Sequence, residues 1–215
     1  ANKKSIKTSK TQHDDIIRDV ANELWLNKGK SLIISGSDMI EMQVVINAIN
    51  QLLGNYEKTI STTIHSNVYS SVDDDIINLT SDMNNNNVDV VMFLNTNPVY
   101  TLSDSDSFKN ALSKVSTKIS FSDSLDETSA LCDYVCPDTN YLESWGDLNP
   151  YTGFYVLQQP TISPLFDSRQ VQDSLLKWMG RDDIYYDYLR NYCKNNISTN
   201  WNKILHDGYH SNKSN

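Results

Sequence analysis

The sequence predicts an α/β fold: a mostly parallel, Rossmann-like sheet flanked by helices, followed by a long ordered loop and C-terminal helices. Three observations support this prediction. Short apolar runs alternate with amphipathic helical stretches up to residue 136. The best run, residues 88–94 (VDVVMFL), is almost continuously apolar, which suits a central parallel strand covered on both faces. Short connections and right-handed crossovers then favour parallel strands with helices on both faces.

The first elements are predicted from periodicity and glycine punctuation. Residues 14–27 carry apolar side chains at helical spacing, and Gly29 is placed to end that helix. Residues 31–35 (SLIIS) are short, apolar and rich in β-branched side chains, which predicts a buried strand. Residues 38–53 again have one apolar face, and Gly54 is expected to stop this second helix.

The turn between this strand and helix contains Gly36 and Ser37. A helix that follows a strand offers unpaired N–H groups to an anion, so the turn is a candidate nucleotide contact. However, one glycine is not the G-x-G-x-x-G pattern, and a plain strand–helix turn is the favoured interpretation.

The remaining elements follow from the same patterns. Further strands are expected at residues 59–64, 88–94, 118–121 and 134–136, and further helices at 73–83, 107–115, 126–132, 170–179, 182–192 and 199–206. We expect residues 14–206 to form a single domain between two flexible tails, 1–13 and 207–215.

The segment 137–169 is expected to be a long ordered loop. It contains Pro137, Pro150, Pro160 and Pro164, and proline removes a backbone donor and fixes φ. Long loops in compact domains are often functional. Side chains in this loop are open to two interpretations. Glu143 and Asp147 are expected to accept backbone N–H bonds that hold the shape of the loop. Gln158, Gln159 and Arg169 could bind a pterin or phosphate or satisfy loop carbonyls, and we favour the second.

Composition argues against several classes of partner. The 215 residues carry a net charge of −9, which disfavours nucleic acid and anionic membrane surfaces. No stretch approaches the roughly 20 apolar residues of a membrane span. No signal peptide is evident at the start of the sequence, which begins at Ala1.

No catalytic or metal-binding set can be assembled from the residues. Cys132, Cys136 and Cys193 lack the spacing of a zinc or iron–sulfur site, so we expect them to pack like small apolar residues. His206 and His210 have helical spacing but no third ligand. We therefore expect no catalytic residue and no metal ligand in this chain.

Three motifs in order carry a family resemblance. The runs D-E-T-x-A-L-x-D-x-V-x-P-D, L-E-S-W-G-D and L-Q-Q-P-x-I-x-P-L-F-D-x-R-Q resemble the molybdopterin oxidoreductase superfamily, most closely the iron–sulfur subunit of alternative complex III. The matching positions are Glu127, Thr128, Ala130, Asp133, Val135 and Pro137, with Glu143 and Gly146 matching more loosely. The similarity extends more weakly back to about Gly29.

The resemblance implies a scaffold domain of a respiratory electron-transfer complex. Such a domain would bind no metal itself, and a downstream domain of the parent subunit would carry the iron–sulfur clusters. Its expected partners are other domains of the parent chain and subunits of a membrane-bound complex. The expected location is the periplasmic side of the bacterial inner membrane.

Two alternatives remain open. In the first, the parent is an active molybdenum oxidoreductase and this domain binds a molybdopterin guanine dinucleotide. The resemblance then implies cofactor contacts at Gly36, Ser37, Asn95, Asn97, Glu143 and Gly146. In the second, the chain is a stand-alone nucleotide-binding module.

Overall fold

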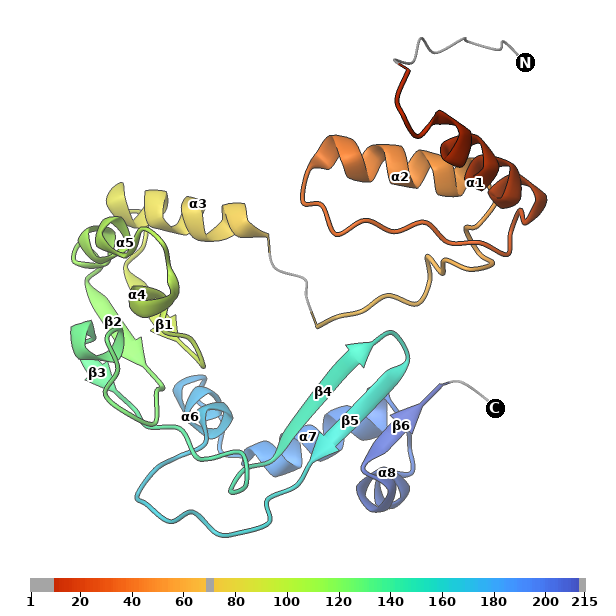
Figure 1. The fold of residues 1–215 in the computed structure, drawn as a ribbon. Coiled ribbons are helices and arrows are strands. Elements are labelled where there is room, and N and C mark those ends of the chain that lie inside the picture. Colours follow the sequence, from red (N-terminus) through yellow and green to blue (C-terminus); the bar gives the residue numbers. More distant parts are fainter. Residues whose placement is uncertain (1–9, 69–71, 213–215) are drawn as a thin grey trace. The chain divides into compact units, whose positions relative to one another are not determined.

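The computed structural model describes residues 10–68 and 72–212. The chain divides into two compact units, residues 1–65 and 66–215, each with its own architecture. The first unit is helical, and the second contains a parallel and an antiparallel sheet (Figure 1). The chain is thus of the mixed α/β class that the sequence predicts.

The first unit is built on two helices, α1 (Asp14–Leu26) and α2 (Ile40–Leu52). Both are predicted from their apolar stripes. The glycines that follow them adopt left-handed backbone, with φ of 70° at Gly29 and 66° at Gly54, which glycine tolerates without strain.

The predicted strand at residues 31–35 is wrong, because the segment is extended but joins no sheet. Its hydrogen bonds come from a buried side chain of α2. The Asn50 amide donates to the Ile33 carbonyl at 2.8 Å and its Oδ1 accepts from the Ile33 N–H at 3.1 Å. One asparagine thus supplies the pair of bonds that a neighbouring strand would otherwise give.

The predicted strand at residues 59–64 is also wrong. The carbonyl of Asn55 accepts hydrogen bonds from the N–H groups of Lys58, Thr59 and Ile60. This closes a tight turn, and only an isolated bridge between Tyr56 and Ile60 remains. Local turn bonding therefore replaces sheet pairing in this stretch.

The second unit opens with a parallel sheet in the order β1-β2-β3. Its strands are β1 (Val90–Phe93), β2 (Thr117–Ser120) and β3 (Tyr134–Val135). They confirm the strands predicted at 88–94, 118–121 and 134–136. The parallel sheet therefore has three strands among the described residues, where the sequence predicts five.

Helices surround this sheet. They are α3 (Asp73–Asn84), α4 (Pro98–Thr101) and α5 (Ser105–Leu112), with a 3-10 turn η1 (Ser129–Leu131). The buried face of β1 packs against α3 and α5 in one core cluster. That cluster contains Met83, Val91, Phe93, Phe108, Ala111, Leu112 and Val115. The predicted helix at 126–132 is thus only a 3-10 turn, and α4 is an additional short helix that starts at a proline.

The expected loop at 137–169 is partly a β-hairpin, formed by β4 (Gly146–Tyr151) and β5 (Phe154–Gln158). Gly153 has a φ of 79°, which allows the reversal between the strands. The register shifts between Leu148 and Tyr151, where Pro150 removes a ladder donor. The alternation of apolar and polar residues that would indicate a strand is broken at Pro150. The sequence therefore does not predict β4.

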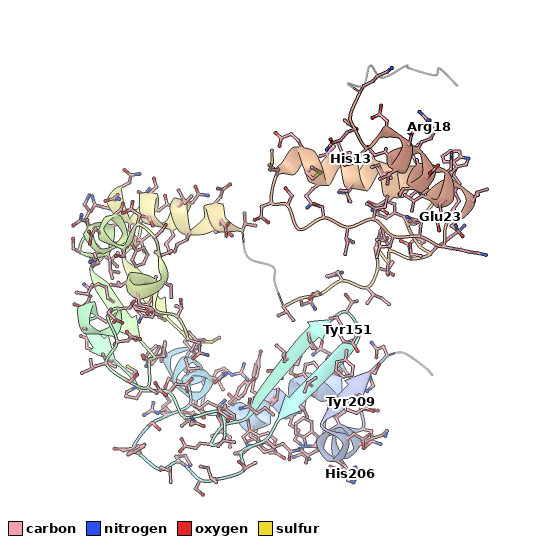
Figure 2. The ribbon with its side chains drawn as sticks, in the orientation of Figure 1. His13, Arg18, Glu23, Tyr151, His206 and Tyr209 are labelled. Atoms are coloured by element: carbon pink, nitrogen blue, oxygen red, sulfur yellow. The ribbon has the colours of Figure 1, made fainter. Side chains whose placement is uncertain are left out.

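The flexible tail expected from residue 207 is likewise corrected. Residues Tyr209–Ser211 form β6, which pairs antiparallel with β5. Gly208, with a φ of 77°, turns the chain out of the preceding helix and into this strand. The ring of Phe154 stacks on those of Tyr151 and Tyr209, with centroids 4.9 and 5.4 Å apart. Tyr151 and Tyr209 are labelled in Figure 2.

The three predicted C-terminal helices are confirmed as α6 (Val171–Trp178), α7 (Tyr185–Asn196) and α8 (Trp201–Asp207). Their buried side chains form a second core with β5 of the antiparallel sheet. This core contains Tyr155, Leu157, Leu176, Tyr185, Leu189, Cys193, Trp201 and Ile204. The helices thus share their core with the antiparallel sheet, which the sequence does not predict.

Candidate functional site at the carboxyl ends of the parallel strands

Three loops leave the parallel sheet from the carboxyl ends of β1, β2 and β3. This edge is where open α/β sheets generally bind ligands. Two neighbouring cavities lie here, of about 550 Å³ and about 280 Å³. Both are lined by Asn95 after β1, Asp123 after β2, and Asp138 and Thr139 after β3. The larger one also reaches the β4–β5 hairpin through Gly146 and Val156.

Asn95 and Asn97 shape the wall that follows β1. Asn95 has a φ of 51°, a left-handed conformation that asparagine tolerates better than most residues. The Asn97 amide donates to the Glu127 carboxylate at 2.7 Å, and its Oδ1 accepts from the Thr128 hydroxyl at 2.6 Å. Thr128 Oγ1 in turn accepts from the Val99 N–H at 3.1 Å.

This network explains two of the sequence motifs physically. The Asn97-Pro98 pair and the Glu127-Thr128 pair are about 30 residues apart, yet they bind each other side chain to side chain. The hydrogen bond from Asn97 also holds the pKa of Glu127 below its ordinary value. These motifs therefore tie two strand-end loops together.

Asp126 is fixed by its neighbours in the second loop. Its Oδ1 accepts from the Ser129 N–H at 2.6 Å and its Oδ2 from the Ser122 hydroxyl at 3.1 Å. Burial alone would raise the pKa of Asp126, but the hydrogen bonds from Ser129 and Ser122 outweigh it and lower this pKa. Asp126 thus remains a carboxylate that closes its own turn.

The charge of the two cavities is negative. Their lining includes the carboxylates of Asp123, Asp126, Asp138 and Asp147. No lysine, arginine or histidine is among the described residues that line either cavity. A ligand that carries phosphate groups would therefore meet like charges here.

Glutamines of the larger cavity are occupied by the backbone. Gln158 donates to the carbonyls of Tyr141 at 2.7 Å and Ser144 at 3.2 Å. Gln159, just outside the cavity, donates to the Leu205 carbonyl at 2.7 Å. The interpretation that Gln158 binds loop carbonyls is confirmed, whereas Gln159 binds a carbonyl of helix α8 (Trp201–Asp207). For Arg169, the expectation that its side chain binds a loop carbonyl stays a prediction.

Glu143 also binds loop backbone. Its Oε2 accepts from the Asn140 N–H at 3.1 Å, and its Oε1 accepts from the Leu165 N–H at 3.0 Å. The expected role of accepting backbone N–H bonds is therefore confirmed for Glu143, but it is wrong for Asp147, whose carboxylate accepts from the hydroxyls of Tyr155 and Tyr185. Glu143 is not among the residues that line the two cavities, whereas Gly146 lines the larger one.

Of the six cofactor contacts predicted from the sequence, only some therefore lie together in the structure. Asn95, Asn97 and Gly146 lie along the two neighbouring cavities. Gly36 and Ser37 belong to the first unit, where the Ser37 carbonyl is bound by the Gln43 amide. Asp123, Asp138 and Thr139 are lining residues that the sequence reasoning missed. The sequence signal for Asp123 and Asp138 is that each lies three residues after the end of a strand.

Metal-ligating residues are dispersed in the described ranges. No group of three or more His, Cys, Asp or Glu side chains there is placed to hold a metal ion. The three cysteines are free thiols, and burial raises the pKa of the fully buried Cys193. No helix in residues 10–68 or 72–212 is both long and apolar enough to cross a bilayer.

Comparisons with known proteins find a sequence relative and a group of similar solved structures. The menaquinone reductase, molybdopterin-binding-like subunit of Nitratidesulfovibrio vulgaris is 39% identical over 89 residues, which is 40% of this chain. The chain spans about 13% of the length of that relative. No protein-family model matches the chain.

Acetylene hydratase from Pelobacter acetylenicus is a solved structure with a TM-score of 0.48 and 16% identity. The similarity covers 63% of this chain and 20% of the hydratase. The sequence relative is, by its name, of the kind that the motifs around Glu127 and Pro137 resemble. Over 40% of its length the chain is therefore similar to a molybdopterin-binding-like subunit.

Proposed function

We propose that this chain serves as a scaffold domain in a molybdopterin-binding-like subunit of a quinone-linked respiratory complex, on the periplasmic side of the bacterial inner membrane. In this role it binds no metal and no pterin nucleotide. It holds its shape and presents surfaces to other domains and subunits. The observation that carries the proposal is the 39% identity over 89 residues to a menaquinone reductase subunit of the "binding-like" kind.

The charge at the strand ends supports the absence of a dinucleotide. A pyrophosphate bridge is anionic and is normally held by helix N-termini, arginine or lysine. The described lining of the two cavities offers four aspartates and no cation. Two like charges 4 Å apart repel by about 4 kcal/mol at an effective dielectric constant of about 20. The residues present therefore do not fit the group.

The hydrogen bonds at the strand ends support the same proposal. Both polar atoms of the Asn97 amide are used within the protein, by Glu127 and Thr128. Asp138 Oδ1 accepts from the N–H groups of Thr139 at 2.8 Å and Val171 at 2.9 Å. Side chains that satisfy one another in this way stabilise loops and leave few groups for a ligand.

Calorimetric titration with GDP, the nucleotide half of the dinucleotide, tests the proposal. We expect no heat of binding up to millimolar GDP. Micromolar binding that is weakened at least tenfold by Asn97→Ala would overturn the scaffold role. Asn67→Ala is a matched control, because Asn67 binds the Asn149 backbone on the hairpin and lines neither cavity.

One observation favours the alternative of dinucleotide binding. Asn95, Asn97 and Gly146, each implied by the family resemblance, line two neighbouring cavities at one edge of the sheet. A guanine base has N–H groups that can donate hydrogen bonds to carboxylates. The negative charge of the cavities therefore does not oppose the binding of the guanine part of the dinucleotide. The GDP titration separates the two functions.

A further inference from the structure

We draw no further inference here: the strongest candidate, the cluster of aspartates that lines the two cavities at the carboxyl ends of β1, β2 and β3, belongs to the site already described, and no second observation on the described residues points to a ligand for it.

Discussion

At the carboxyl end of β1, Asn95 holds a backbone conformation that most residues avoid. Its φ of 51° lies in the left-handed region, where side chains with a branched Cβ clash with the backbone. Strain of this kind, about 1–3 kcal/mol, persists only where surrounding contacts enforce it. Here Asn97, two residues further along the same loop, is hydrogen-bonded to Glu127 and Thr128. The strained residue Asn95 is therefore part of the cavity wall.

Replacing Asn95 tests this strain. Asn95→Val should lower the free energy of unfolding by about 1–3 kcal/mol, because a branched side chain is disfavoured at positive φ. Asn95→Gly should change it by less than about 1 kcal/mol. Urea unfolding followed by fluorescence measures both. Equal losses for the two variants would show that the side chain, and not the backbone, matters.

Asp126 provides a pH-dependent test at the same scale. Its pKa is lowered from 3.8 in the folded state, so its charged form adds stability above that value, and this stability is lost as pH falls through the folded pKa. Asp126→Asn should therefore cost about 1 kcal/mol at neutral pH and less at pH 3, below the ordinary pKa of the carboxyl. Urea unfolding at both pH values is the measurement. A cost that stays constant with pH would contradict the charge argument.

At the scale of the elements, the carboxylate of Asp147 links β4 to both β5 and α7. Asp147 Oδ2 accepts from the Tyr155 hydroxyl at 2.7 Å, and Oδ1 accepts from the Tyr185 hydroxyl at 2.8 Å. Tyr155 lies on β5 and Tyr185 begins α7. Burial, reinforced by Asp147, raises the pKa of both tyrosines, which stay protonated donors at any physiological pH.

Removing this carboxylate should loosen the hairpin from α7. Asp147→Leu leaves two partly buried hydroxyls without an acceptor, so we expect a loss of about 2–4 kcal/mol in the free energy of unfolding. Tyr185→Phe removes only one bond and should cost about 1 kcal/mol. Thermal and urea unfolding provide the values. If Asp147→Leu costs no more than Tyr185→Phe, the shared acceptor is not what joins these elements.

Elements with a strong local signal could be predicted from the sequence. The strand β1 (Val90–Phe93) lies within the run 88–94, where nearly every side chain is apolar, and the amphipathic helices follow from their apolar stripes. The segment 31–35 has the same local signal, but its partner is the Asn50 side chain, and no local pattern indicates that contact. In β4, Pro150 interrupts the alternation that would indicate a strand.

The candidate site was predictable to a similar degree. Asn95 and Asn97 are implied by the family resemblance, and both line cavities. Asp123 and Asp138 read as ordinary turn residues, because polar side chains commonly follow strands. Only the parallel order β1-β2-β3 brings these carboxylates to one edge of the sheet. The acidic character of the site is thus a tertiary property.

The whole chain combines similarity to a molybdopterin-binding-like subunit with two strand-end cavities whose described lining residues include no lysine, arginine or histidine. The sequence match concerns 40% of this chain and 13% of the relative, so the proposed loss of cofactor binding rests on charge and hydrogen bonding. Compounds that stabilise the protein by binding should raise its unfolding temperature. By this reasoning GDP and pterin nucleotides are expected to leave that temperature unchanged.

Elemental analysis of the protein purified from its natural source tests the central claim most directly. Molybdenum and tungsten are measured by plasma mass spectrometry, and the pterin is measured by its fluorescence after oxidation. The account predicts neither metal above the buffer background and no pterin fluorescence. One molybdenum or tungsten atom per protein chain, together with an equivalent amount of pterin, would contradict it.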